Sequence, residues 1–276
     1  MKLKKNTLIY KTFCPLLLFF CLAGILKAQD DKPATSAEEL AKKLSNPVAS
    51  LISIPFQNNM DVGIGQYNGS RNTLNFQPVI PIHLSPKLNL ITRVVIPIIA
   101  QYSIDTTGSN QFGLGDAVLS AFLSPAEAKN GLVWGVGPVF LLPIATEDML
   151  ASKKWGIGPT ALILKQTHGW TFGVLANQIW SVAGNKDRPD VNQMFVQPFL
   201  SYNWKSGAGL GLSGEITQNW RSNNTTAFII PTITAVTKLG GQIVLFVIGP
   251  RIQVASAPGN RAAFGVRAGI TFVFPK

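Results

Sequence analysis

Five charged residues lie inside segments of the chain that are otherwise largely apolar, and they are the first candidates for a functional site. Guanidinium and carboxylate groups can pair with one another, and a cluster with an excess of guanidinium groups can also attract an anion. Four of the five share the polar face of segments in which polar and apolar residues alternate. The fifth has no clear face, because its surroundings, GLGDAVLSAFL, are apolar on both sides. The four are Arg93, Glu215, Arg251 and Arg267, and the fifth is Asp116.

The two histidines of the chain, His83 and His168, do not form the pattern of a catalytic site. A hydrolase of the serine–histidine type needs a nucleophile that its histidine can activate, and neither histidine has a recognisable nucleophile motif beside it. The histidines and acidic residues also lack the spacing of metal ligands. We therefore expect that the chain is not an enzyme and has no catalytic, cofactor-binding or metal-binding residues.

The segments that carry the charged residues have the period of β-strands. From residue 60 onward, turn signals alternate with strand patterns and no helical period is found. Most of the predicted strands reach the nine to eleven residues that a tilted membrane strand needs. The pattern predicts twelve of them, at 60–67, 71–83, 88–101, 113–124, 132–143, 155–167, 170–182, 191–204, 208–220, 225–237, 242–254 and 262–274.

The six tryptophans all fall on the apolar face of their strands and near a strand end. Two aromatic girdles of this kind are typical of membrane barrels, whereas a soluble sandwich would turn its apolar face inward. Trp170 and Trp180 lie ten residues apart on one strand, which is about 33 Å along it and about 25 Å across a membrane at the usual tilt. The girdles are Trp134, Trp170 and Trp204 at one end and Trp155, Trp180 and Trp220 at the other.

The composition also favours an exported membrane barrel. Charged residues make up 13% of the chain, against about 25% in soluble domains. A basic start followed by an apolar stretch predicts a signal peptide over 1–28. This segment holds both cysteines and five lysines but no acidic residue, so its removal lowers the formal charge from +11 to +6. No basic cluster remains, and we expect no nucleic-acid partner.

The links between the predicted strands differ on the two sides of the sheet. One side has mostly short turns and the other has longer polar loops at 102–112, 144–154 and 183–190. Short periplasmic turns and longer extracellular loops are typical of outer-membrane barrels. These loops are of modest length and carry mixed charges, which favours a pore over an adhesion platform.

Five strands contain a proline that follows glycine or glutamine, at Pro78, Pro138, Pro159, Pro198 and Pro250. Proline cannot donate to a strand ladder, so we expect a local bulge at each step. The five prolines share the lipid-facing side, and many glycines line the opposite side, which suggests a lumen with free space. Pro97 departs from this rule, because it shares the face of Arg93.

Before the strands, the residues 36–45 predict a short helix. Ser36 and Glu39 form a capping box, and Pro47 provides a stop signal. The predicted organisation is therefore a signal peptide (1–28), an N-terminal segment (29–59) with this helix, and a barrel (60–276). The helix is either a partial plug in the lumen or a periplasmic helix outside it, and the sequence leaves both open.

Several phrases of the chain resemble a bacterial family of outer-membrane transporters that genome annotation often labels "neuromedin U". The resemblance extends over nearly all of the chain after the signal peptide. It implies an outer-membrane barrel of a Gram-negative bacterium, surrounded by outer-membrane lipid and inserted by the outer-membrane assembly machinery. The phrases are SNPVASLISIPFQNNMDVGIG (45–65), QPVIPI (77–82), GLGD (113–116), WGVGPVFLLPIATED (134–148), KWGIGPTALILKQ (154–166) and ITFVFPK (270–276).

These observations predict an all-β, transmembrane antiparallel β-barrel of about twelve strands with a short N-terminal helix. We expect passive passage of a small solute through the lumen. The charged residues either bias that passage toward anions or pair with each other to hold the wall together. The alternatives are a closed barrel with a structural or surface role and, with less support, a barrel enzyme that acts on lipid. The solute and the oligomeric state stay open.

Overall fold

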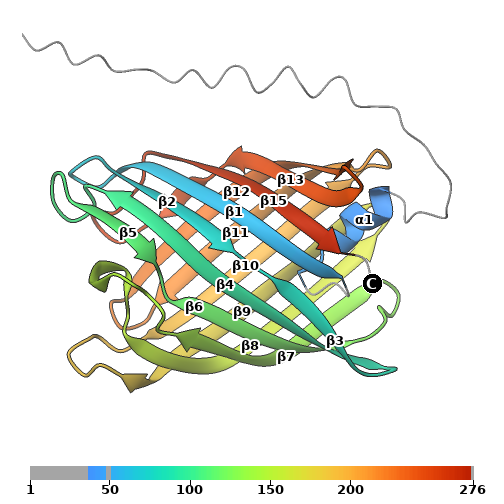
Figure 1. Cartoon of the computed structure of the whole chain (residues 1–276), viewed down its shortest axis with the longest axis horizontal. Coiled ribbons are helices and arrows are strands. Elements are labelled where there is room, and N and C mark those ends of the chain that lie inside the picture. The colour runs from blue at the N-terminus through green and yellow to red at the C-terminus, as the bar shows by residue number, and fades with distance from the viewer. Residues whose placement is uncertain (1–36, 48–50, 275–276) are drawn as a thin grey trace, which may run out of the picture. The chain divides into compact units, whose positions relative to one another are not determined.

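The alternating segments form a long series of antiparallel strands, and one helix precedes them (Figure 1). The computed structural model describes residues 37–47 and 51–274, so the predicted signal peptide (1–28) lies outside the described residues. The elements are α1 (Ala37–Leu44), β1 (Ile52–Ile64), β2 (Gly69–Phe76), β3 (Val79–Ser85), β4 (Leu88–Tyr102), β5 (Asn110–Leu114), β6 (Ala117–Pro125), β7 (Leu132–Leu142), η2 (Asp148–Leu150), β8 (Lys154–Thr167), β9 (Trp170–Gly184), β10 (Asn192–Asn203), β11 (Ala208–Asn219), β12 (Asn224–Leu239), β13 (Gln242–Pro250), β14 (Ile252–Ala255) and β15 (Phe264–Phe274).

The strands close into a barrel. Barrel strands that follow one another in the chain pair antiparallel, and β15 pairs with β1 to complete the circle. Three barrel strands are each interrupted once, between β2 and β3, β5 and β6, and β13 and β14, so the fifteen segments make twelve barrel strands. The predicted twelve-stranded antiparallel β-barrel is therefore confirmed.

The first strand begins earlier than predicted. We expected it at 60–67 and the barrel at 60–276, but β1 starts at Ile52. Pro55 interrupts the alternation of apolar and polar residues in this stretch. In the barrel, Pro55 lies opposite Thr271 of β15, and its carbonyl oxygen accepts a hydrogen bond from the Gln77 amide at 2.9 Å. The N-terminal segment is correspondingly shorter than the predicted 29–59.

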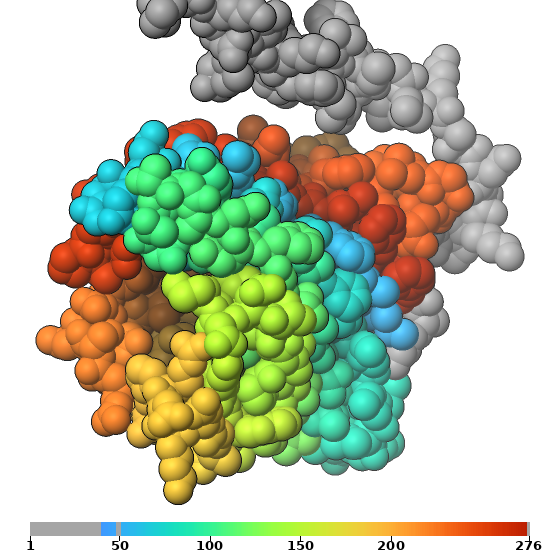
Figure 2. Space-filling view, turned by 60° about the vertical axis from the view of Figure 1, so that its left-hand side comes forward, coloured from blue at the N-terminus to red at the C-terminus, as the bar shows by residue number. Residues whose placement is uncertain are grey.

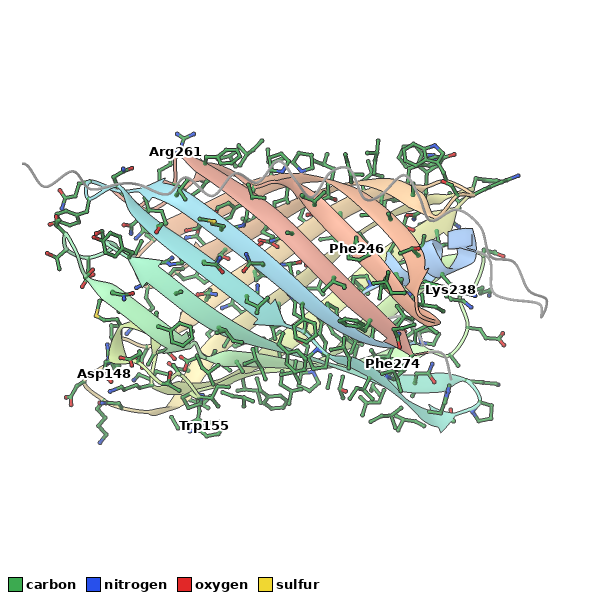
Figure 3. The ribbon with its side chains drawn as sticks, turned by 45° about the horizontal axis from the view of Figure 1, so that its top comes forward. Asp148, Trp155, Lys238, Phe246, Arg261 and Phe274 are labelled. Carbon is green, nitrogen blue, oxygen red and sulfur yellow. The ribbon has the colours of Figure 1, made fainter. Side chains whose placement is uncertain are left out.

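The two ends of the barrel differ, as the link lengths predict. Short turns and links join the strands at one end, which we call the turn end. The other end, the loop end, carries the longer links 103–109, 143–153, 185–191 and 256–263. Figure 3 shows Asp148 and Arg261 at the loop end and Lys238 and Phe274 at the turn end. Among the described residues, no helix is long and apolar enough to cross a membrane.

The outer surface of the barrel is apolar. In several strands the side chains of one parity are exposed, and most of the exposed ones are large hydrophobic residues such as Phe246, Ile248 and Ile163. All six tryptophans belong to this set, with 41–52% of their surface exposed. Three lie toward the turn end and three toward the loop end, as predicted, and Trp155 points away from the barrel at the lower edge of Figure 3.

The proline steps do not contain the predicted bulges. At Pro78, Pro138, Pro159, Pro198 and Pro250 the register of Cα partners is the same on both sides of the step. The pairing lapses with one neighbouring strand at four of these steps and with both neighbours at Pro78. At the three Gly-Pro steps the glycine lies against a carbonyl oxygen of the adjacent strand. A Cβ atom would come within 1.7–1.9 Å of that oxygen in each case, at Gly137, Gly158 and Gly249.

These contacts also correct the interpretation of the glycines. We expected them to leave free space in the lumen, but the position of a Cβ at most of them is already taken by the neighbouring strand. At Gly173, for example, it would lie 2.5 Å from both the Ile163 carbonyl oxygen and the Leu164 side chain. The glycines therefore allow strands to approach one another closely.

A bulge does occur opposite Pro97, which faces the lumen. Between Leu114 and Ala117 the strand facing β4 shifts its register by one residue. The Gly115 amide bonds the Pro97 carbonyl oxygen at 2.8 Å, and a Cβ on Gly115 would meet the proline ring at 2.9 Å. The lumen-facing position of Pro97, which departs from that of the other strand prolines, therefore coincides with the interruption of the neighbouring strand between β5 and β6.

The turn-end half of the lumen is filled by side chains. A buried apolar cluster extends across the inward faces of β3 to β10, and aromatic rings from β10 pack against it. Apolar side chains pack against one another here as they do in the core of a soluble protein, and their burial stabilises this half of the barrel. The cluster consists of Val79, Ile91, Phe122, Val133, Leu162, Leu164 and Leu175, with Phe195 and Phe199 beside it.

The helix α1 lies at the turn end and contacts lumen-facing residues of several strands (Figure 1). Leu40 and Ala41 are buried against Val236, and Leu44, Ile243 and Leu245 pack around them. Two polar contacts reach the wall at β8 and β10. The Gln166 amide donates to the Lys42 carbonyl oxygen at 2.6 Å, and the Asn203 amide donates to Ser45 Oγ at 3.0 Å.

Candidate functional site

Three of the five predicted charged residues meet in the lumen. Glu215 of β11 accepts a hydrogen bond from Arg267 of β15 at 2.7 Å, and its second oxygen lies 3.7 Å from Arg251. Arg251 also pairs with Asp61 of β1. These four side chains, which we call the ion-pair cluster, are each at most 17% exposed. They join β1, β11 and β15 with the segment between β13 and β14.

Further contacts hold the two arginines of the cluster in position. The Arg267 Nε group donates to Asn59 Oδ1 at 2.7 Å. The Arg251 guanidinium carbon lies 3.3 Å from the centre of the Phe228 ring, in a cation–π contact. Gly265 makes room for the pair formed by Asp61, because a Cβ there would lie 2.5 Å from the carboxylate. Both arginines are thus fixed on several sides.

A third arginine, Arg71 of β2, lies next to the cluster. It is the cross-strand partner of both Asp61 in β1 and Gln101 in β4. Its Nε group donates to Gln101 Oε1 at 2.8 Å, and the Gln101 amide in turn donates to Gln111 at 3.1 Å. Among the described residues, Arg71 forms no ion pair with a carboxylate.

Arg71 and three members of the cluster, Asp61, Glu215 and Arg251, border a cavity of about 400 Å³ near the loop end, which we call the mouth cavity. Figure 2 shows the molecule hollowed at this end, between the loops. The lining comes from the cluster, from polar residues of β1, β2, β12 and β14, and from the loops 103–109 and 256–263. It comprises Asn59, Asp61, Ile64, Arg71, Thr73, Asn75, Ile104, Glu215, Thr226, Phe228, Arg251, Gln253, Ser256, Ala257, Asn260 and Ala262.

The other two predicted residues lie elsewhere. Arg93 faces the lumen, but it does not line the mouth cavity; its Nη2 group donates to Gln77 Oε1 at 2.7 Å. Asp116, a lumen candidate whose face the sequence left open, organises a loop. Its carboxylate accepts hydrogen bonds from the amides of Ala145 at 3.2 Å and Ser152 at 2.7 Å. The bulge between β5 and β6 turns it toward the 143–153 link.

Asp61 and Arg71 are site residues that we did not predict. Both fall inside predicted strands, and the motif DVGIGQYNGSR that contains them reads as a tight hairpin. Pairing the two strands across that turn would have brought the two side chains opposite each other. The signal was therefore present, but the misplaced start of β1 hid the alternation of Asn59 and Asp61.

At the loop end, ion pairs also connect the links. Lys154 at the start of β8 is buried, and its ammonium group donates to Asp190 at 2.9 Å; Arg221 approaches the same carboxylate at 3.3 Å. The hydrogen bond and charge of Lys154, together with the hydrogen bond from Ser181, hold the pKa of Asp190 below its usual value. These contacts tie together the 185–191 loop, β8 and the turn that follows β11.

The histidines have local partners. His83 Nδ1 lies 2.8 Å from Asn89 Oδ1, and His168 Nδ1 lies 2.8 Å from Thr167 Oγ1 in the turn between β8 and β9. Within residues 37–47 and 51–274, no group of three or more histidine, cysteine, aspartate or glutamate side chains is arranged to hold a metal ion.

Comparisons with known proteins bear on the fold. No protein-family model matches the chain, and no curated protein matches it in sequence. Among solved structures, it is similar to an outer membrane channel from Pseudomonas putida F1, with 15% identity and a TM-score of 0.65 over 89% of this chain and 100% of that one. It also matches the outer membrane phospholipase dimer of Salmonella typhi with bound calcium, with 12% identity and a TM-score of 0.47 over 87% and 98% of the two chains. The first similarity shows that the chain has the fold of an outer-membrane barrel.

Proposed function

We propose that the protein is an outer-membrane channel of a Gram-negative bacterium that lets a small solute pass through its lumen with a preference for anions. The observation that carries the proposal is the polar, charged mouth cavity inside a closed barrel whose outer surface is apolar. An apolar exterior with tryptophans toward both ends suits a lipid environment. Export by the predicted signal peptide and insertion by the outer-membrane assembly machinery belong to the same proposal.

The preference for anions follows from the charge count at the cavity. Arg71, Arg251 and Arg267 face only two carboxylates, so this group carries a net charge of about +1. A positive potential in a narrow lumen raises the local concentration of anions. The two interpretations of the charged residues are compatible, because most of them pair while the excess charge remains.

We further propose that α1 acts as a plug at the turn end. Its apolar contacts with Val236, Ile243 and Leu245 and its polar contacts with β8 and β10 support this role. Together with the apolar cluster of the turn-end half, the helix would limit the conductance of the resting barrel. Solute passage would then require that the helix moves.

The test is the conductance of the purified protein in planar bilayers, with the reversal potential measured across a KCl gradient. We expect discrete channel openings with a preference for chloride. A Leu40→Arg variant should raise the open probability, because a charge would disrupt the packing against Val236, while Lys42→Arg on the same helix should behave like the wild type.

If neither the wild type nor Leu40→Arg conducts although both are folded, the channel is refuted. This result would favour the second candidate, a closed barrel with a structural or surface role, which the filled turn-end half of the lumen supports. Openings of the wild type that Leu40→Arg leaves unchanged would refute the plug alone.

A further inference from the structure

We propose that the mouth cavity is a binding site for one small organic carboxylate, held by the guanidinium of Arg71. The inference deepens the proposed function by naming the class of solute. It depends on three features of the cavity: the charge that remains after the ion pairs are formed, the orientation of Arg71, and the mixture of side chains that surround it.

The first feature is the unbalanced charge. Arg251 and Arg267 are engaged by Asp61 and Glu215, so their charges are compensated within the ion-pair cluster. Arg71 is in contact with a neutral amide, that of Gln101. Among the described residues Arg71 has no carboxylate within ion-pair distance, and its cross-strand neighbour Asp61 is already paired with Arg251. The cavity therefore offers one positive charge in excess of its carboxylates, which a monoanion would balance.

The second feature is the way Gln101 orients Arg71. The side-chain amide of Gln101 donates to Gln111 at 3.1 Å, which directs its oxygen toward the Nε group of Arg71. Guanidinium has five N–H groups in a planar fork, and this contact uses one of them. The contact anchors the side chain by Nε, and no hydrogen bond within the described residues involves its terminal nitrogens. Two parallel N–H groups of this kind fit a carboxylate in bidentate geometry.

The third feature is the size and lining of the cavity. Its volume of about 400 Å³ lies within the range of pockets that hold small organic molecules. Polar side chains around Arg71, such as Thr73 and Asn75, are accompanied by apolar ones on the loop side, Ile104 and Ala257 among them. An inorganic ion would leave this apolar surface uncovered, whereas a carboxylate with a short carbon chain would contact both kinds of surface.

The cavity lies near the loop end, so the site would act at the entrance of the lumen. Binding there would collect carboxylates from the loop-end solution and would make their passage saturable. The site would hold the acid group loosely enough to release it, because Arg251 and Arg267, the other arginines beside Arg71, are already paired with Asp61 and Glu215.

The experiment measures binding of butyrate to the purified full-length barrel in detergent by isothermal titration calorimetry. Butyramide serves as the uncharged probe of the same shape, and inorganic phosphate as the anion without a carbon chain. The Arg71→Gln variant removes the proposed ligand. Arg93→Gln is the matched control, because it removes the same charge from the lumen at a position outside the cavity.

We expect butyrate to bind the wild type and Arg93→Gln with affinities within about twofold of each other. Its affinity for Arg71→Gln should fall by about tenfold or more, as for the loss of a charged hydrogen bond. Butyramide should not bind. Should Arg71→Gln fail to fold, Arg71→Lys tests the same point, since it keeps the charge and loses the fork, and its affinity should fall as well.

Three results would overturn the inference: equal binding by wild type and Arg71→Gln, equal binding of butyramide and butyrate, or binding of phosphate without binding of butyrate. The calorimetry is independent of conductance. A barrel that conducts but does not bind butyrate contradicts only the inference, and one that binds butyrate but never conducts contradicts only the proposed channel.

Discussion

Replacing Glu215 with glutamine should destabilise the barrel by about 3 kcal/mol. Glu215 contacts Arg267 at 2.7 Å and Arg251 at 3.7 Å, and both guanidinium groups are almost completely buried. Loss of one partner of a buried ion pair costs about 3–5 kcal/mol, because the other charge stays buried without compensation. Glutamine keeps the shape and an acceptor oxygen for Arg267, so we expect the lower end of that range.

The measurement is the urea dependence of unfolding for the refolded protein in lipid vesicles, followed by tryptophan fluorescence. Glu127→Gln is the control, since Glu127 is exposed in the link between β6 and β7 and a surface change of this kind stays within about 0.5 kcal/mol. A double variant, Glu215→Gln with Arg267→Met, should recover part of the loss, because it removes the charge left unpaired. A loss below about 1 kcal/mol for Glu215→Gln would show that the ion-pair cluster does not stabilise the wall.

Two further predictions concern the strand contacts and the loops. Gly158→Ala should destabilise the barrel by about 1–3 kcal/mol or more, because the new Cβ would lie 1.7 Å from the Gln178 carbonyl oxygen. Gly269→Ala is the control and should cost less, because the nearest atom to its Cβ lies at 3.2 Å. Equal unfolding midpoints of the two variants would refute the argument. The lowered pKa of Asp190 means that its contribution to stability is complete above its unfolded pKa of about 3.9 and is lost as the pH falls through the lower folded value. The unfolding midpoint of the wild type should therefore fall toward that of Asp190→Asn below about pH 4, and parallel pH profiles of the two proteins would contradict this.

Much of the fold could be predicted from the sequence, because strand parity depends on local alternation. The six tryptophans are exposed on the outer surface, as strand parity predicted, because successive side chains of a strand point to opposite faces. The start of β1 was missed where the alternation is weak and Pro55 interrupts it. Parity also indicates which side a glycine faces, but not whether that space belongs to the lumen or to the next strand, so the role of Gly158 was misjudged.

The site was only partly predictable, because its contacts depend on closure of the barrel. Parity assigned Glu215, Arg251 and Arg267 to the lumen, yet nothing local indicates that β11 and β15, which are not neighbours in the sheet, bring two of them to 2.7 Å. Arg71 was overlooked because a single arginine near a hairpin turn resembles any solvated residue. Asp116 could not be assigned, since its direction is set by a bulge that has no clear sequence signal.

The close approach of glycines to carbonyl oxygens has a consequence for the width of the lumen. At Gly137, Gly158 and Gly249 the neighbouring strand fits only where a Cβ is missing. Sliding the strand by two residues at Gly249 would bring Val247 or Arg251 against the same oxygen, whereas at Gly137 and Gly158 only one direction brings a bulkier residue, because Gly135 and Gly156 lie two residues away in the other. The Gly249 contact therefore opposes a change of stagger in both directions, and the other two oppose it in one direction. Strand number and stagger together determine the tilt and diameter of a barrel. Contacts that resist a change of stagger therefore also resist a change in the diameter of the lumen. Any change in what the lumen admits must then come from its side chains, its loops or the helix at the turn end, and not from a widening of the wall.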